Sequence, residues 1–215
     1  MLSRFLKRIF DLVFALLAAI LLAPVFLLAA LMVKLFSPEA PVLFKQRRIG
    51  HKNRPFIIYK LRSMSDQRDE NGVLLPDEQR LKPWGKIIRA SNLDELPQIY
   101  HIILGQMSWI GPRPLLPQEM QVMLPEEQEL RQSMPPGISG WEAVNEGKSQ
   151  NRRQMAEFDL YYVRNWSLLF DLKIFFKTLF IVLLKLRPAD ALRAPKLSAQ
   201  EIISADSEPV TPPDP

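Results

Sequence analysis

The chain contains no cysteine and only two histidines, His51 and His101, among 215 residues. Without cysteine it has no disulfide, no thiolate nucleophile and no cysteine metal site, which fits a reducing compartment. A histidine-rich zinc site or a Ser-His-Asp triad would depend on a single imidazole, so both kinds of site are disfavoured. Carboxylates are therefore the groups left for catalysis.

Glycine is also scarce, with 8 residues against 19 prolines, which predicts many rigid turns. The length fits one compact domain with attachments. Acidic residues are outnumbered, and the formal net charge of +5 points to anionic partners. Nucleic acid, phosphorylated metabolites and lipid headgroups all meet that description.

Residues 12–33 form a run of 22 residues without a charged or polar side chain. At ~1.5 Å per residue, a helix of this length crosses a ~30 Å hydrocarbon core. A cleavable signal peptide fits less well, because its apolar region is only ~7 to 15 residues long. The run therefore predicts a membrane segment.

The topology of this segment is left open by the sequence. Pro24 lies near its middle, where proline removes a helix hydrogen bond and bends or breaks the helix. A helix interrupted there enters and leaves the membrane on one face, whereas a kinked helix spans it. Basic residues lie on both flanks and defeat a simple positive-inside assignment: Arg4, Lys7 and Arg8 before the run, and Lys34, Lys45, Arg47, Arg48, Lys52, Arg54, Lys60 and Arg62 after it.

Two adjacent carboxylates, Asp94 and Glu95, are the strongest candidates for chemistry. They also suit a helix cap in which Glu95 closes a capping box on Asn92. That register would put Pro97 inside the helix at a cost of ~3 kcal/mol. A helix starting at Leu93 or Asp94 instead has Pro97 in its first turn. The helix dipole would then favour the ionised carboxylates, as a nucleophile, a metal ligand or a neighbour of phosphate.

Four basic residues are candidate phosphate contacts. Short strands are predicted at 42–44 and 56–59, and alternation would place Lys60 and Arg62 together on one face at a strand end. Arg89 stands close to the carboxylates in sequence, and prolines on both sides of Arg113 restrict its backbone. The alternatives are a basic face on anionic lipid for the first two residues and an exposed surface turn for Arg113.

The remaining segments are predicted from their patterns. Residues 65–82 predict a solvated loop, and helices are expected at 99–104, ending at Gly105, and at 115–131, with no catalytic role for the second. An aromatic stripe at 156–166 predicts core packing, and Asp159 within it is a candidate substrate-binding residue. Residues 166–187 suit an amphipathic helix on the bilayer surface or on the core, and 188–215 should be disordered.

The order of these features resembles the bacterial sugar transferase family, the small monotopic phosphoglycosyl transferases. The matching features span roughly residues 1–187, and the ordered set is specific although each piece is weak alone. They are the basic N-terminus with Asp11, the apolar run broken at Pro24, Gln46-x-Arg48-x-Gly50, residues 60–64 (KLRSM), residues 93–98 (LDELPQ), residues 107–114 (MSWIGPRP) and residues 136–140 (PGISG).

The resemblance implies an α+β, mainly helical fold. A re-entrant membrane helix at 1–36 would precede a compact cytoplasmic catalytic domain at 37–187 with amphipathic interfacial helices, followed by the tail at 188–215. The protein would lie in the bacterial inner membrane with its domain facing the cytoplasm. A homodimer is left open.

The resemblance also implies an activity, the Mg²⁺-dependent transfer of a sugar-1-phosphate from a UDP-sugar to polyprenyl (undecaprenyl) phosphate. By the family pattern Asp94 attacks the β-phosphate, UMP leaves, and the lipid phosphate resolves the covalent intermediate. Glu95 would be its acid or metal-supporting partner, so that Asp94 and Glu95 are the expected metal ligands. Charge on the leaving side would be neutralised by Mg²⁺ and the basic candidates, Lys60, Arg62, Arg89 and Arg113.

The chain departs from the family pattern at three places. Ala23 stands where small members often have serine, and Gln106 replaces an aspartate. Residues 141–148 (WEAVNEGK) replace the usual Ala-Gln-Val-Asn-Gly-Arg, so the donor sugar stays open.

Two rival functions remain open. One is a non-catalytic membrane adapter, and the other is a nucleotide-sugar phosphohydrolase in which water replaces the lipid acceptor. Nucleic acid is not expected as a partner, because the basic residues lie beside a membrane segment and no recognition motif is present.

Overall fold

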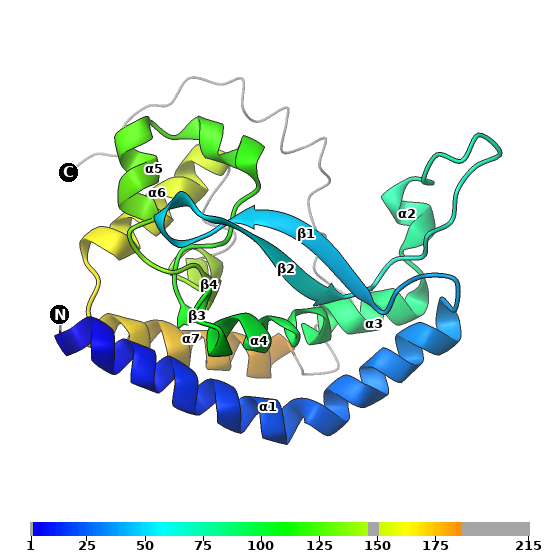
Figure 1. Cartoon of the computed structure of the whole chain (residues 1–215), viewed down its shortest axis with the longest axis horizontal. Helices are drawn as coiled ribbons and strands as arrows, with labels where there is room; N and C mark the ends of the chain where they lie inside the picture. Colours follow the sequence, from blue (N-terminus) through cyan, green and yellow to red (C-terminus); the bar gives the residue numbers. More distant parts are fainter. Residues whose placement is uncertain (1, 146–150, 186–215) are drawn as a thin grey trace.

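The apolar run forms most of one long helix. In the computed structural model, which describes residues 2–145 and 151–185, helix α1 spans Leu2–Phe36 and contains Pro24. The helix continues through the proline and bends instead of breaking, and Figure 1 shows both of its ends rising toward the rest of the molecule. Among the described residues, α1 is the one helix long and apolar enough to cross a membrane, and only 11% of its apolar window is buried.

Two strands form a hairpin above α1. Strand β1 (Leu43–Ile49) pairs antiparallel with β2 (Pro55–Leu61), and the short 3₁₀ helix η1 (His51–Asn53) lies in the turn that connects them. Both predicted strands are present but extend further. The basic segment around Arg48, expected between the strands, lies within β1, where Arg48 pairs with Phe56 and Gln46 pairs with Ile58. Alternation therefore puts Arg48 and Lys60 on the same face of the hairpin.

Short helices fill the space between the hairpin and α1 (Figure 1). They are α3 (Pro83–Ala90), the 3₁₀ turn η2 (Leu93–Glu95) and α4 (Gln98–Ile103). The predicted end of α4 at Gly105 is confirmed, because Gly105 has a φ of +77°, the left-handed conformation that glycine adopts after a helix. The predicted loop 65–82 forms the arm at the upper right of Figure 1, with one turn of helix, α2 (Asp77–Arg80).

A second, parallel strand pair lies beside α4. Strand β3 (Ser108–Ile110) pairs with β4 (Gly137–Ser139), so the PGISG motif at 136–140 contains a strand. The backbones approach closely here, since a Cβ on Gly137 would lie 2.2 Å from the nitrogen of Gly111. Glycine is required at that contact because any side chain would overlap the neighbouring backbone.

The second half of the chain forms the upper left of Figure 1 and returns to α1. The single helix predicted at 115–131 is wrong, because Pro117 begins the 3₁₀ helix η3 (Pro117–Val122) and Pro125 begins a separate helix, α5 (Pro125–Arg131). The chain continues as η4 (Ala143–Asn145), α6 (Arg152–Arg164) and α7 (Leu168–Lys185). The mainly helical α+β architecture is confirmed, and the predicted tail at 188–215 lies outside the described residues.

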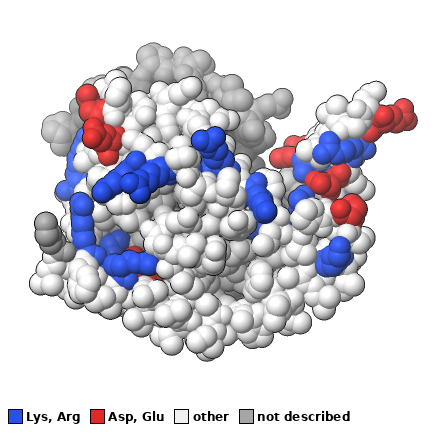
Figure 2. Space-filling view, in the orientation of Figure 1, with Lys and Arg blue, Asp and Glu red and all other residues white. Residues whose placement is uncertain are grey.

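Helix α7 packs on the core with one side and exposes the other, while a position on the bilayer surface stays a prediction. Its Ile174 is fully buried, whereas Leu169, Phe176 and Phe180 are more than half exposed. Phe175 also meets Phe14 of α1, with ring centroids 6.4 Å apart. The two helices therefore share an apolar face, and the lower rim of Figure 2, where α1 bends, carries almost no charge.

Polar residues of α1 fasten it to the domain. Lys7 is buried and donates to the carbonyl of Ile110 at 2.9 Å and to Oδ2 of Asp171 in α7 at 2.6 Å. Asp171 also accepts from Tyr162 and Trp166, at 2.7 and 3.1 Å. The buried ion pair is thus surrounded by donors, which a charge removed from water requires.

The next residues of α1 extend this network. Arg8 donates to the carbonyls of Ile102 and Ile103, where a cation at the C-terminus of α4 is stabilising. Asp11 accepts from the hydroxyl of Ser108 and the backbone N–H of Trp109, both at 3.0 Å. Lys7 and Arg8 therefore both make contacts within the fold.

The buried pair predicts a large stability change when one partner is removed. Lys7→Met should destabilise the protein by about 3 to 5 kcal/mol, because Asp171 is left buried without its cation. Thermal unfolding in detergent measures the change. Lys34→Met is the matched control, since this lysine of the same helix donates to Pro38 at an exposed position. The double variant Lys7→Met/Asp171→Asn should recover part of the loss, and strictly additive losses would contradict the pairing.

Candidate active site

The carboxylate pair lies in a turn and not at the start of a helix. Asn92 adopts the left-handed region at φ 56° and separates α3 from η2, which contains Asp94 and Glu95. Pro97 is the N-cap residue of α4, which begins at Gln98. The predicted helix start at Leu93 or Asp94 is therefore wrong, because the chain makes a 3₁₀ turn before the proline. Pro97 does remain where its missing N–H costs nothing.

The environment of Asp94 favours the protonated form more than expected from the sequence. Burial, and then the neighbouring charge of Glu95, raise the pKa of the Asp94 carboxyl, while Lys60 and Arg89 act in the opposite direction. The predicted dipole effect is small here because α4 begins three residues after Glu95. A carboxyl group whose pKa is raised by burial, and which lies close to cations, is typical of a functional site.

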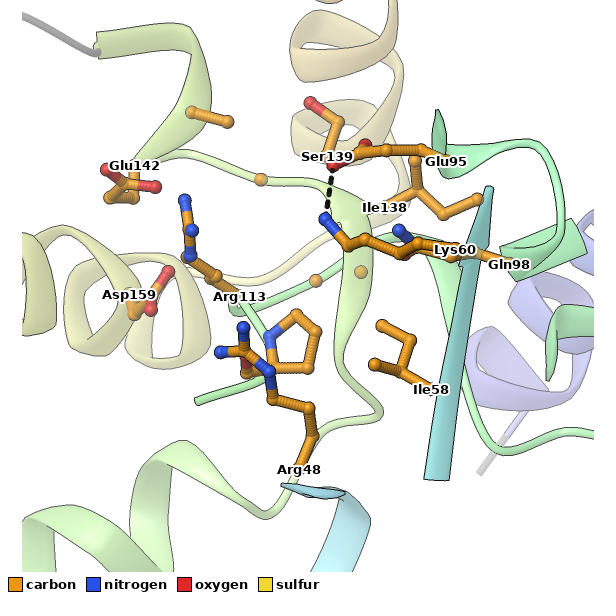
Figure 3. Close-up of a pocket in the computed structure, with 15 residues that line it drawn as sticks. Arg48, Ile58, Lys60, Glu95, Gln98, Arg113, Ile138, Ser139, Glu142 and Asp159 are labelled. Atoms are coloured by element: carbon orange, nitrogen blue, oxygen red, sulfur yellow. Dashed lines mark hydrogen bonds and ion pairs between the residues drawn. The ribbon is translucent and has the colours of Figure 1, made fainter. Parts of the chain in front are cut away.

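Glu95 connects this turn to the hairpin. Its Oε1 lies 3.1 Å from Nζ of Lys60, and both side chains are partly exposed, at 30% and 26%. Lys60 extends from β2 on the same face as Arg48. Figure 3 shows the Lys60 and Glu95 side chains converging at the edge of an open cavity.

The cavity lies between the hairpin, the η2 turn, the β3–β4 pair and α6, and its empty space, mouth included, is about 520 Å³. Its charged lining residues are three basic and three acidic side chains, Arg48, Lys60, Arg113, Glu95, Glu142 and Asp159 (Figure 3). Gln98, Ser139 and backbone at three glycines complete the polar wall. Asp94 is not among the lining residues but directly precedes Glu95. Such an arrangement can hold a phosphate-bearing ligand beside a carboxylate.

A buried ion pair supports the position of Arg113. Arg131 is fully buried, and its Nη2 donates to Oδ2 of Asp159 and to the backbone carbonyl of Arg113. Burial raises the pKa of Asp159, and the Arg131 charge opposes that change. The second oxygen of Asp159 accepts no hydrogen bond from the described residues. Asp159 thus reaches the cavity wall while also holding the Arg113 loop through Arg131, and its role in substrate binding stays a prediction.

The other predicted phosphate contacts lie outside this cavity. Arg62 turns away to the carbonyl of Pro41 and to Asp66, at 2.7 and 2.9 Å. Strand β2 ends at Leu61, so the alternation that paired Arg62 with Lys60 does not continue to it. Arg89 donates to Ser63 at 2.9 Å but still lies close enough to Asp94 to lower its pKa.

Sequence reasoning missed two contributors to the site. Arg48 lines the cavity and is held by Gln46, by Glu119 and by the carbonyl of Pro114. The Gln46-x-Arg48-x-Gly50 motif contains this arginine. The segment was expected to be a loop between the strands, so the direction of the Arg48 side chain was not predicted. Arg131 was assigned to a helix without a role, and no local pattern pairs it with Asp159, 28 residues away.

The donor set limits how a metal can bind. No group of three or more His, Asp or Glu side chains that could hold a metal is found in residues 2–145 and 151–185. Mg²⁺ in phosphoryl-transfer sites usually takes one or two carboxylates together with substrate phosphates. The adjacent Asp94 and Glu95, beside a cavity with three basic side chains in its wall, fit that kind of site and do not fit an all-protein cage.

Comparison with known proteins gives consistent relatives. The chain is 42% identical over 169 residues to the uncharacterized sugar transferase EpsL of Bacillus subtilis, covering 79% of this chain and 83% of EpsL. It is 40% identical over 187 residues to the UDP-glucose:undecaprenyl-phosphate glucose-1-phosphate transferase of Escherichia coli, covering 83% of this chain but 40% of that enzyme.

A third relative has another donor in its name. The UDP-N-acetylgalactosamine-undecaprenyl-phosphate N-acetylgalactosaminephosphotransferase of Aeromonas hydrophila is 38% identical over 190 residues, 83% of this chain and 44% of that enzyme. The chain thus spans less than half the length of these two enzymes. The model of the family described as bacterial sugar transferase matches residues 2–185. The predicted resemblance is confirmed: the chain belongs to the bacterial sugar transferase family.

Proposed function

We propose that this protein transfers a sugar-1-phosphate from a UDP-sugar to polyprenyl phosphate at the cytoplasmic face of the bacterial inner membrane, as the first membrane step of glycoconjugate assembly. The observation that carries the proposal is the position of Glu95, which directly follows the partly buried Asp94, at a cavity lined by Arg48, Lys60 and Arg113. The names of the relatives point to the same activity, with glucose in one donor and N-acetylgalactosamine in another. The donor sugar of this chain is therefore left to experiment.

In the first step a carboxylate oxygen of Asp94 attacks the β-phosphorus of the donor. The bond from that phosphorus to the bridging oxygen breaks, and UMP leaves with the bonding electrons. Lys60 and Arg113 line the cavity where negative charge gathers on the leaving side, and fixed cations stabilise such charge. Aspartate is an established type of covalent phosphoryl acceptor.

In the second step a phosphate oxygen of the polyprenyl acceptor attacks the phosphorus held on Asp94. The acyl phosphate bond breaks, the Asp94 carboxylate is restored, and the product is a polyprenyl diphosphate sugar. Glu95 shares a turn with the nucleophile and pairs with Lys60, so it orients that lysine. Mg²⁺, when bound near Asp94 and Glu95, would neutralise part of the diphosphate charge.

The apolar face suits an acceptor that resides in a membrane. Helices α1 and α7 expose large apolar side chains on one side of the molecule, and both ends of α1 turn toward the domain (Figure 1). Apolar surface on this scale is more than monomeric soluble proteins usually expose. We propose that α1 is re-entrant and that the face lies in the cytoplasmic leaflet. The catalytic cavity would then be close to the lipid phosphates.

The nucleophile is tested by Asp94→Asn. Purified protein with Mg²⁺ and a panel of UDP-sugars should release UMP and gain the mass of one phosphosugar. The variant should show no adduct and lose at least about 1,000-fold of the UMP release, as expected when a covalent nucleophile is removed. Asp77→Asn is the matched control, because Asp77 is exposed in the α2 arm.

Each other outcome has a clear meaning. An adduct that persists on Asp94→Asn would place the nucleophile elsewhere. No UMP from any donor, with the fold intact, would favour the adapter. A turnover rate that does not depend on polyprenyl phosphate would favour the phosphohydrolase.

The pH dependence follows from the pKa of Asp94. That pKa is raised, so the nucleophile protonates at a higher pH than an ordinary aspartate, and UMP release should fall as the pH drops through it. Glu95→Gln removes the like charge and frees Lys60, and both changes lower the pKa of Asp94. The acidic limb of the initial-rate profile should therefore move to lower pH. Glu70→Gln in the exposed arm is the control, and an acidic limb that stays in place or moves upward would contradict the coupling.

The topology is tested with single cysteines, which the natural chain lacks. Ser3→Cys and Glu39→Cys are at exposed positions at the two ends of α1, and Asn71→Cys in the arm reports the domain. A membrane-impermeant maleimide should label none of the three in intact spheroplasts and all of them after permeabilisation. Labelling of Ser3→Cys or Glu39→Cys, but not both, in intact spheroplasts would establish a spanning helix.

A further inference from the structure

A second pocket lies away from the candidate active site. It is enclosed by the N-terminal turns of α1, the turn between β1 and β2, the end of α4 and the segment between α5 and β4. Its lining residues are Arg4, Lys7, Arg8, Asp11, His51, Gly105, Met107, Ser133, Met134 and Pro135, and none of them lines the catalytic cavity. The proposed transfer reaction assigns it no task.

The charges in this wall do not cancel. Lys7 is paired with Asp171, and Asp11 accepts from Ser108 and Trp109. Arg8 donates to backbone carbonyls of α4, which satisfy its hydrogen bonds but leave its positive charge. Arg4 is exposed and makes no hydrogen bond or ion pair with the rest of the described chain. Two guanidinium charges therefore face the pocket against the single carboxylate of Asp11, whose hydrogen bonds likewise leave its charge, so the wall carries a net positive charge among the described residues.

The surroundings add further positive charge. Burial, and then the charges of Lys52, Arg4 and Arg54, lower the pKa of His51, whereas a hydrogen bond with the backbone of Ser133 opposes this change. The His51 ring lines the pocket beside these charges. Figure 2 shows basic side chains gathered on this face between the β1–β2 turn and the N-terminal end of α1. An anion entering here is attracted from several directions.

The pocket sits where the apolar face of α1 begins. Leu2, Phe5 and Ile9 are 71%, 63% and 43% exposed on the same turns that contribute Arg4 and Arg8. Apolar side chains that enter a leaflet beside cations that stay at its surface are typical of a headgroup contact. The methionines and proline of the wall would meet the less polar part of the same lipid molecule.

We propose that this pocket binds the phosphate of an anionic membrane phospholipid and so holds the N-terminal end of α1 at the level of the headgroups. The ligand chemistry is a phosphodiester contacted by Arg4 and Arg8, with His51 beside it. A free phosphate from solution offers part of the same chemistry, but it has no apolar portion for Met107, Met134 and Pro135. The inference relies on the interfacial position proposed for α1 and not on the transfer chemistry.

The test is a thermal-unfolding titration of the full chain in a zwitterionic detergent, without donor or acceptor. The probes are short-chain phosphatidylglycerol, short-chain phosphatidylcholine and inorganic phosphate. Phosphatidylglycerol should raise the melting temperature in a saturable way, and the other two should not at equal concentration. In Arg4→Gln the half-saturating concentration of phosphatidylglycerol should rise about fivefold, the scale of one basic residue near an anionic headgroup.

Two further variants locate the effect. Arg4→Lys should keep most of the affinity, because it keeps the charge. Lys86→Gln removes an exposed charge from α3 and should leave the titration unchanged. Equal effects of Arg4→Gln and Lys86→Gln would overturn the site, as would equal shifts with phosphatidylcholine. An equal shift with inorganic phosphate would show an anion site fed from solution and overturn the lipid assignment.

The outcomes separate this site from the catalytic one. A saturable phosphatidylglycerol response in a protein that releases no UMP would refute the transfer reaction alone. Normal UMP release with a titration insensitive to Arg4→Gln would refute the lipid site alone.

Discussion

The buried contact of Lys7 with Asp171 and Ile110 is the interaction on which the arrangement depends. Together with the bonds of Arg8 and Asp11, it attaches the largely apolar helix α1 to the domain, and its acceptor at Ile110 ends β3, three residues before Arg113. Tyr162 of α6 reaches the same carbonyl. A charge removed from water must keep its partners, so α1, the strand pair and α7 are held together. The position of the candidate active-site cavity relative to the apolar face follows from this attachment.

The closeness of the cavity to the apolar face suits the proposed reaction. A diphosphate donor is soluble in water and a polyprenyl phosphate is not, so an enzyme joining them needs a charged cavity within reach of an apolar surface. The cavity supplies cations from β1, β2 and the Arg113 loop, and the turn at Asp94 supplies a carboxylate whose burial is offset by Lys60 and Arg89. The bent α1 and the exposed side of α7 supply the apolar surface. Each part is ordinary alone, and their proximity makes the proposed transfer feasible.

The cavity shows how far local patterns reach. Lys60 and Glu95 were expected at the site and do meet at its edge, because strand alternation and the adjacent carboxylates are short-range features. Arg62 is two residues after Lys60 and was expected on the same face. It lies one residue beyond the end of β2, so strand alternation no longer sets the direction of its side chain. Arg48 could be assigned to the cavity face only once β1 was seen to extend through it. Pro125 begins a separate helix within a segment that was expected to form one helix.

The sequence by itself determined the long apolar helix, the adjacent carboxylates, the mainly helical class and the family, because these depend on contiguous residues and on their order along the chain. Only the tertiary structure decided which charged side chains form ion pairs. Lys7 finds Asp171 at a separation of 164 residues, and Arg131 finds Asp159 at 28. It also decided that Asp94 is buried enough for its pKa to rise. Burial and ion pairing depend on how elements pack against one another, and no local spacing carries that information.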